Sequence, residues 1–349
     1  MTTLNLDDFL SSSGPLFDVR TPAEFTQGHI PGARNLPLFD DDERVVVGTT
    51  YKRQGREAAI LAGLDYVGPK MRRLIEQAMV VAGPPLSAPL RMHCWRGGMR
   101  SGAVSWLMRF YGYDVVTLAG GYKSFRRHAL DVVGTPRTIL IVGGRTGSGK
   151  TQVLHALAAA GEQVLDLEGL AHHKGSAFGA IGEAPQPSTE HFENLVGAQW
   201  HTFDPERVVW IEDESRMVGQ CRIPERLWPQ MVEAHAVVVD SAMERRVARL
   251  VHAYGQAGRH QLERCFQAIR KRLGGLRLKQ AMGALQQEEL GRAAELALHY
   301  YDRAYDHGIA RRVGAGLVAH HVDGDREAAD VAADLIAFSK TFDPIHRTT

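Results

Sequence analysis

The sequence predicts an α/β protein with two domains, and three observations support this prediction. Domains usually hold about 100–200 residues, so a chain of 349 residues favours two of them. Short apolar runs alternate with helical patterns along both halves, as in layered α/β folds. Gly134 and Pro136 interrupt these patterns. We therefore expect domains at 1–132 and 138–349, joined by a linker at 133–137.

The residue pattern of the N-terminal half predicts three strands and four helices. Short apolar runs bounded by turn residues predict strands at Leu16–Val19, Leu90–Cys94 and Val115–Leu118. Helical spacing of apolar residues predicts helices at Pro22–Gln27, Lys70–Ala82, Arg100–Tyr111 and Tyr122–Leu130.

The C-terminal half predicts a second sheet, interrupted by helices. Its expected strands are Thr138–Val142, Val164–Leu167, Val208–Ile211, Ala236–Val239 and Leu317–His320. The first leads through a glycine-rich turn into a helix at Thr151–Ala160, and Asp325–Phe342 predicts a final helix. Between strands, about 241–311 predicts a helical insertion, in which Leu262, Phe266, Ile269 and Leu273 share one face.

Composition places the chain among ordinary globular proteins, with 44% hydrophobic and 23% charged residues. No apolar run reaches the ~18–20 residues of a membrane span, and the N-terminus has no signal-peptide pattern. We expect a cytoplasmic protein without a membrane partner. Cys94, Cys221 and Cys265 are odd in number and widely spaced, so we expect free thiols rather than a disulfide framework or a C-x-x-C metal site.

Charge is balanced overall but uneven along the chain. The net charge of +1 argues against avid, nonspecific nucleic-acid binding. Between Arg245 and Lys279, however, ten Lys and Arg residues stand against one acidic residue, Glu263. Such a stretch could neutralise several phosphates. On charge alone, however, a solvated helical face is the favoured interpretation, because charge runs are usually that.

Residues 93–101 form a loop suited to a reactive thiol. Cys94 ends an apolar strand just before a helix, so successive backbone N–H groups and the helix N-terminus point towards its sulfur. We expect Arg96 and Arg100 to add positive charge, which makes Cys94 a nucleophile near neutral pH. The rest of the anion-binding backbone would come from Trp95, Gly97, Gly98 and Met99, with the glycines permitting close approach.

The first domain resembles a rhodanese domain. The resemblance lies in the cysteine loop, in Asp18-Val-Arg-Thr-Pro-Ala-Glu24 and in Gly28-His-Ile-Pro-Gly-Ala-Arg-Asn-Leu-Pro37. It implies that Cys94 carries a sulfur or selenium atom during turnover. The Cys-x5-Arg spacing from Cys94 to Arg100 is also that of cysteine-dependent phosphatases of the Cdc25 type, which share the rhodanese fold, so a phosphatase remains an alternative.

The glycine-rich turn of the second domain is a complete Walker A pattern, Gly144-Arg-Thr-Gly-Ser-Gly-Lys-Thr151, between a strand and a helix. Its backbone would bind a diphosphate and Lys150 would neutralise the outer oxygens, while Thr151 would ligate Mg²⁺. We expect Asp213, with Glu212 as the alternative, to help hold the metal from the end of a strand. The predicted diphosphate-binding residues are Gly144, Thr146, Gly147, Ser148, Gly149, Lys150, Thr151 and Asp213.

Together, a rhodanese-like loop and a Walker A domain resemble the tRNA 2-selenouridine synthase family. Further stretches carry the resemblance along the chain: 48–56, 173–179, 186–188, 192–193, 210–216, 301–302 and 305–306. His93, which precedes the nucleophile, departs from the family pattern, and we expect the change to be tolerated. The expected fold is thus an N-terminal rhodanese-like domain plus a C-terminal P-loop NTPase-like domain with a basic helical segment.

The resemblance implies a transferase that converts a wobble 2-thiouridine of tRNA to 2-selenouridine through an S-geranyl intermediate. Geranyl diphosphate and selenophosphate would be substrates, no cofactor would be tightly bound, and a selenophosphate synthetase would be a partner. Cys94, Arg96 and Arg100 would act in the selenium step. The residues expected to contact tRNA are Arg245, Arg249, Arg270, Lys271, Arg272, Arg277, Lys279, Lys52 and Arg56.

Two other classes of function remain open at this stage. One is a sulfurtransferase or phosphatase joined to a P-loop ATPase or kinase. The other is a sulfur-relay carrier that passes a persulfide to another enzyme.

Overall fold

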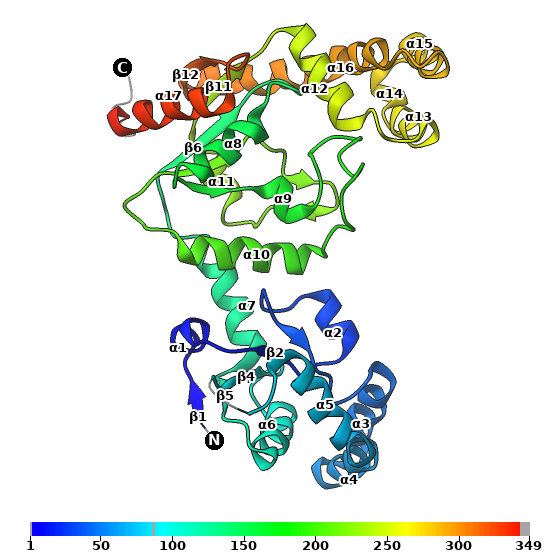
Figure 1. Ribbon diagram of the computed structural model, residues 1–349, viewed down its shortest axis with the longest axis vertical. Helices are drawn as coiled ribbons and strands as arrows, with labels where there is room; N and C mark the ends of the chain where they lie inside the picture. The colour runs from blue at the N-terminus through cyan, green and yellow to red at the C-terminus, as the bar shows by residue number, and fades with distance from the viewer. Residues whose placement is uncertain (1, 86–87, 343–349) are drawn as a thin grey trace. The chain divides into compact units, whose positions relative to one another are not determined.

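The computed structural model describes residues 2–85 and 88–342, which form two compact units (Figure 1). Unit 1 holds the described residues of Met1–Val132 together with Glu190–Ala198. Unit 2 holds those of Val133–Thr189 and Gln199–Thr349. Residues 190–198, which the sequence placed in the second domain, therefore pack with the first.

Unit 1 is built on a five-stranded parallel sheet with the strand order β1-β5-β4-β2-β3. The strands are β1 (Thr2–Leu4), β2 (Leu16–Asp18), β3 (Arg34–Asn35), β4 (Leu90–His93) and β5 (Val115–Leu118). The helices are α1 (Leu6–Ser11), α2 (Pro22–Gln27), α3 (Asp41–Gln54), α4 (Arg56–Val67), α5 (Met71–Ala82), α6 (Met99–Tyr111) and α7 (Gly121–Val132), with a 3₁₀ turn at Gly68–Lys70.

Both faces of this sheet are buried. Phe17 and Val115 belong to one buried cluster, whereas their neighbours Leu16 and Val116 belong to another. Because successive side chains of a strand point to opposite faces, the two clusters lie on opposite sides. Helices cover both faces, as parallel sheets require.

Helices α3 and α4 were not predicted from the sequence, and the reason is physical. Helix α3 buries none of its side chains and α4 buries only Ala59 and Gly63, so apolar periodicity does not reveal them. A capping box in which the Asp40 and Glu43 side chains accept from each other's backbone N–H marks the start of α3. Lys52 lies on α3 and Arg56 begins α4.

Unit 2 has a second five-stranded parallel sheet, with the order β12-β11-β6-β8-β7. Its strands are β6 (Ile139–Gly143), β7 (Gln163–Leu165), β8 (Val209–Glu212), β11 (His235–Asp240) and β12 (Val318–Asp323), and β9 (Met217–Val218) pairs with β10 (Cys221–Arg222) as a separate antiparallel ribbon. The helices that accompany the sheet are α8 (Lys150–Ala159), α9 (Leu167–Ala171), α11 (Trp228–Glu233) and α17 (Ala328–Thr341). Helix α10 (Thr189–Thr202) contributes residues 190–198 to unit 1 and its ends to unit 2.

Along the chain, β11 and β12 are connected by a helical segment with a core of its own (Figure 1). It consists of α12 (Met243–Tyr254), α13 (Arg259–Ala268), α14 (Arg270–Leu273), α15 (Gly275–Gln286) and α16 (Leu290–Gly314). All four residues of the predicted apolar face, from Leu262 to Leu273, are buried in this core. The helical insertion expected at about 241–311 is present, although α16 continues three residues beyond it.

In each unit, the motif loop leaves the carboxyl end of an interior parallel strand, where open α/β sheets bind ligands. The cysteine loop follows β4, and the glycine-rich loop follows β6. Among the described helices, none combines the length and the apolar character that crossing a bilayer requires.

Candidate functional site

The cysteine loop directs hydrogen-bond donors at the sulfur of Cys94. The Gly98 N–H donates to Sγ at 3.2 Å, and the Ser101 hydroxyl lies 3.2 Å from Sγ. Burial acts to raise the pKa of Cys94, but hydrogen bonds from the Ser101 hydroxyl and from the backbone N–H groups of Ser101, Arg96 and Gly98 outweigh it and lower the pKa. The loop therefore favours a thiolate.

Cys94 lies at the base of a surface loop. The residue is only 3% exposed, whereas Trp95 and Met99 in the same loop are 38% and 55% exposed. Gly97 has φ +67°, and a Cβ there would lie 2.6 Å from the carbonyl oxygen of Leu118. Gly98 has φ −104° with open space beside it, so the close approach expected at this position is absent.

The two arginines of the loop do not act as the sequence suggested. Arg100 forms a two-pronged ion pair with Glu24, with Nη2 3.1 Å from Oε1. Arg96 is exposed, and what it adds to the sulfur is its backbone N–H. Hydrogen bonds, rather than guanidinium charge, therefore lower the pKa of Cys94, and Ser101 is a contributor that the sequence analysis missed although it ends the motif.

The upstream Asp18–Glu24 segment contacts this loop through the Val19 N–H, which donates to the His93 carbonyl at 3.0 Å. Asp18 accepts from Arg20 Nε at 3.0 Å, both side chains are buried, and Arg20 also donates to the carbonyl of Gly28. The Arg20 guanidinium stacks 3.7 Å from the centre of the Tyr122 ring. His93 is fully buried, and burial lowers its pKa to about 4, so the residue before the nucleophile is a neutral imidazole at neutral pH.

The glycine-rich loop has the backbone of a phosphate-binding loop. Gly144, Gly147 and Gly149 have φ values of +145°, +81° and +97°, a region that favours glycine. Helix α8 begins immediately after them at Lys150, so its N-terminus faces the loop. The buried Ser148 hydroxyl lacks a hydrogen-bond partner among the described residues.

Three glutamates, rather than Asp213, gather beside Lys150 and Thr151. Thr151 Oγ1 lies 3.3 Å from Glu168 Oε2 and 3.5 Å from the carboxylate of Glu212. Lys150 Nζ lies 3.8 Å from Glu212 Oε1. Asp213 instead pairs with Arg312 at 3.0 Å, so Glu212, the alternative named from the sequence, occupies the position expected for Asp213.

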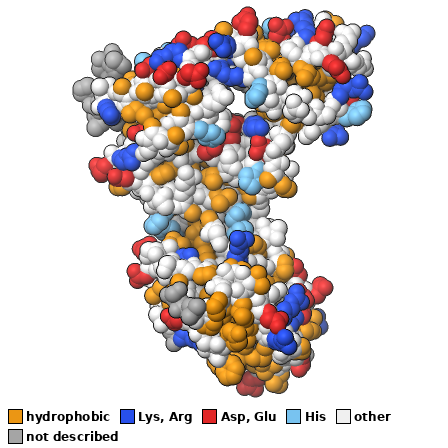
Figure 2. Space-filling view, in the orientation of Figure 1, with side chains coloured by type: hydrophobic (Ala, Val, Ile, Leu, Met, Phe, Trp, Pro, Cys, Tyr) orange, Lys and Arg blue, Asp and Glu red, His pale blue; other side chains and the backbone are white. Residues whose placement is uncertain are grey.

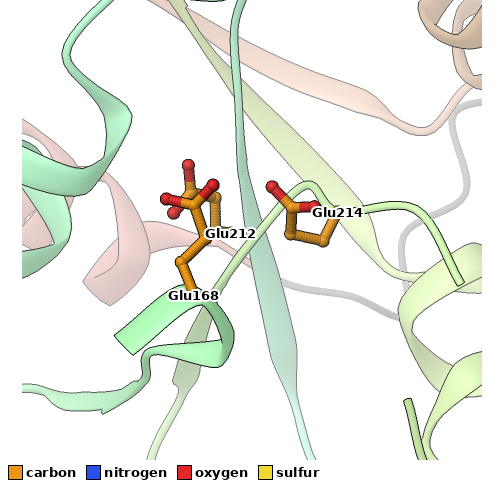
Figure 3. A group of neighbouring side chains, drawn as sticks. All are labelled: Glu168, Glu212 and Glu214. Carbon is orange, nitrogen blue, oxygen red and sulfur yellow. The ribbon is translucent and has the colours of Figure 1, made fainter. Parts of the chain in front are cut away.

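Glu214 completes this carboxylate cluster of Glu168, Glu212 and Glu214 (Figure 3). One oxygen from each lies within 4.8 Å of the others, as ligands of a single metal ion would. Burial, followed by repulsion from neighbouring carboxylates, raises the pKa of Glu168 to about 8 and shifts those of Glu212 and Glu214 in the same direction. A cation placed among them would relieve this repulsion.

Arginines from α12 tie the helical segment to the glycine-rich loop. The Arg246 side chain donates to the Thr146 carbonyl at 2.9 Å and pairs with Asp302 on α16. Arg249 donates to the carbonyls of Gly147 and Ser148 at 3.2 and 3.0 Å. Arg249 therefore has a structural role at the loop, and its expected contact with tRNA stays a prediction.

Most of the other residues expected to contact tRNA lie on the surface. Figure 2 shows basic side chains over the helical segment, interspersed with acidic and hydrophobic ones. Arg277 is half-buried, and the exposed residues are Arg245, Arg270, Lys271, Arg272, Lys279, Lys52 and Arg56.

These observations define a class of protein: a cysteine-loop α/β domain joined to a P-loop domain. Two family models match it, a rhodanese-like domain over residues 4–128 and a tRNA 2-selenouridine synthase AAA domain over residues 137–330. Two tRNA 2-selenouridine synthases are similar over most of their length. The one from Marinobacter nauticus is 36% identical over 89% of this chain and 94% of its own. The one from Shewanella loihica is 35% identical over 87% and 89%.

The chain therefore belongs to the tRNA 2-selenouridine synthase family. The expected fold class, a rhodanese-like domain followed by a P-loop domain, is confirmed. Among solved structures, the N-terminal domain of a protein from Clostridium difficile 630 is 36% identical, covers 36% of this chain and 97% of its own, and has a TM-score of 0.33.

Proposed function

We propose that this protein replaces the sulfur of a wobble 2-thiouridine in tRNA with selenium, using geranyl diphosphate and selenophosphate. The observation that carries the proposal is the pairing, in one chain of this family, of a thiolate-favouring cysteine loop with a diphosphate-binding loop. The relatives' name states both the tRNA and the selenouridine. Supply of selenophosphate by a synthetase, and a cytoplasmic location, belong to the same proposal.

The first step belongs to the P-loop domain. The sulfur of the thiouridine attacks C1 of geranyl diphosphate, the C1–O bond breaks, diphosphate leaves with the electron pair, and the base releases its N3 proton to solvent. The backbone N–H groups of the glycine-rich loop and Lys150 stabilise the charge that develops on the diphosphate. Alkylation matters because it converts the sulfur into a better leaving group.

The second step belongs to the cysteine loop. In the net reaction, selenium from selenophosphate replaces the geranylthio group at C2 of the base. Water takes the phosphoryl group as phosphate, and its two protons go to the geranylthiolate and to the base. Cys94 and the N–H groups around it bind the selenium donor in this step.

Mg²⁺ fits the P-loop site. The unpartnered, buried hydroxyl of Ser148 and the three clustered carboxylates are groups that an ion with its bound diphosphate would satisfy. Thr151 and Glu212 would hold the ion, with Glu168 beside them. When bound, Mg²⁺ neutralises charge on the diphosphate.

Nucleoside mass spectrometry of tRNA treated with purified variants tests the proposal. Cys94→Ser should let geranylated thiouridine accumulate while selenouridine disappears, because only the second step needs the thiol. Lys150→Ala should abolish both products, because the first step needs the diphosphate site. Normal selenouridine formation by Cys94→Ser, or normal geranylation by Lys150→Ala, would contradict the assignment. Rapid ATP turnover independent of tRNA would instead favour a P-loop ATPase.

A further inference from the structure

The helical segment encloses an apolar cavity that borders the P-loop. Its walls come from α12, α13, α15 and α16. Most of the lining is hydrocarbon, and characteristic members are Leu250, Leu262, Phe266, Leu285, Leu290 and Ala294.

The few polar residues of the cavity connect it to the diphosphate site. Thr146 lines the cavity and belongs to the glycine-rich loop. Ser176 also lines it, directly after Gly175, where a Cβ would lie 2.5 Å from the carboxylate of Glu214 and 2.8 Å from that of Glu168. The polar end of the cavity therefore adjoins both the P-loop and the carboxylate cluster.

We propose that this cavity binds the hydrocarbon chain of a prenyl diphosphate whose diphosphate lies on the P-loop. The inference rests on the proposed function and locates the part of the substrate that the P-loop does not recognise. An isoprenoid chain gains binding energy by leaving water for an apolar lining. The lining supplies that apolar surface next to the glycine-rich loop. Arg246 and Arg249 connect the helical segment, which forms the cavity, to this loop.

Small residues of α16 determine how much chain the cavity accepts. Ala293, Ala294 and Ala297 all line it from this one helix. A larger side chain at any of them would fill space that the hydrocarbon needs. These alanines are therefore the residues that set the preferred prenyl length.

The lining argues against a nucleobase as the occupant. A purine needs hydrogen-bond partners for its ring nitrogens and its amino or carbonyl group. Among the lining residues, hydroxyl groups are the only polar side-chain groups, and they belong to Thr146, Ser176, Tyr254 and Tyr301. Burial raises the pKa values of Tyr254 and Tyr301 to about 12, so both remain neutral beside an apolar chain.

Titration calorimetry on the full chain with Mg²⁺ tests this inference, using inorganic diphosphate, geranyl diphosphate and ATP as probes. We expect the wild-type protein to bind geranyl diphosphate at least about 100-fold more tightly than inorganic diphosphate, because the chain is buried. Ala294→Leu should lower the affinity for geranyl diphosphate by about 10-fold or more and leave that for inorganic diphosphate within about twofold. Ala304→Leu, at an exposed position of the same helix, is the matched control and should change neither.

Leu290→Ala tests the inference in the opposite direction. By widening the cavity, this substitution should improve the affinity for farnesyl diphosphate relative to geranyl diphosphate. If Ala294→Leu fails to bind inorganic diphosphate, Leu290→Ala is the variant that tests the cavity assignment. If the wild-type protein binds geranyl diphosphate no more tightly than inorganic diphosphate, or prefers ATP, the proposed function is wrong. If it prefers geranyl diphosphate while both cavity variants behave as wild type, the function stands and the cavity assignment is wrong.

Discussion

At the scale of single residues, hydrogen bonds rather than nearby charge lower the pKa of Cys94. The Arg100 guanidinium forms an ion pair with Glu24, whereas the Ser101 hydroxyl lies 3.2 Å from the sulfur of Cys94. A hydroxyl that donates to a thiolate stabilises the charged form and so lowers the thiol pKa. Ser101 is therefore a positioning and activating residue for Cys94.

Ser101→Ala should raise the pKa of Cys94 and slow its alkylation at pH 7 by about tenfold. The reason is that a hydrogen bond to a charged group contributes about 1.5–3 kcal/mol, equivalent to about one pKa unit or more. The measurement is the pH dependence of iodoacetamide modification, followed by mass spectrometry of the Cys94 peptide. Ser105→Ala is the control, because Ser105 lies on the same helix and its hydroxyl faces Met92 instead. Equal rates for the two variants would rule out the role of Ser101.

At the scale of elements, α9, β8 and the turn after β8 bring three buried carboxylates together. Burial raises their pKa values above the ordinary 4.5, to about 8 for Glu168. Below pH 4.5 the folded and unfolded states are both protonated, and the cluster has little effect on stability. Between pH 4.5 and 8 the unfolded state releases its protons first, so the free energy of unfolding falls as the pH rises.

Removing one carboxylate should therefore stabilise the metal-free protein at alkaline pH but not at acidic pH. Glu168→Gln should raise the melting temperature at pH 8.5 by at least about 2–4 °C, and leave it nearly unchanged at pH 4.5. Mg²⁺ should raise the melting temperature of the wild type more than that of the variant. Glu206→Gln, at an exposed position of the same unit, is the control. A gain that is equal at both pH values would contradict the raised pKa values.

At the same scale, we predict different effects for substitutions at the adjacent residues Glu212 and Asp213. Glu212→Gln should weaken Mg²⁺-dependent binding of inorganic diphosphate, because its carboxylate lies beside Thr151 and Lys150. Asp213→Asn should leave that binding within about twofold and lower the melting temperature instead, because it weakens the pair with Arg312. Calorimetry with inorganic diphosphate and thermal melts measure the two effects. The reverse outcome would restore Asp213 as the metal ligand.

At the scale of the whole molecule, a net charge of +1 coexists with basic residues concentrated on the helical segment. Arg270, Lys271, Arg272 and Lys279 are exposed there, on or beside α14 and α15. Such residues can contact phosphates without making the whole protein strongly basic. This distribution suits a partner that is a polyanion bound at one surface.

Lys271→Ala and Lys279→Ala should each weaken tRNA binding and reduce the slope of log K against log salt concentration by about one, because each removes one phosphate contact. Binding titrations at several salt concentrations measure this slope. Arg326→Ala, whose side chain pairs with Asp334, is the control and should leave the slope unchanged. Unchanged slopes for both lysine variants would place the tRNA elsewhere on the molecule.

Both motif loops could be predicted from sequence because each is a local feature. A cysteine or a run of glycines between a strand and a helix uses only neighbouring residues to make its anion site. Residues 94–101 and 144–151 accordingly lie where the sequence placed them, at the ends of β4 and β6. Strongly periodic elements such as α5 and α6 were likewise found to within one residue at each end.

By itself, then, the sequence determined the α/β class, the two loops and the family resemblance. Only the tertiary structure decided which side chains meet: Glu24 with Arg100, Glu168 with Thr151, and Arg249 with the glycine-rich loop. It also placed residues 190–198 in unit 1 and enclosed the apolar cavity beside Thr146. The physical reason is that these contacts join positions distant along the chain, and their partners are selected by packing, burial and charge rather than by local pattern.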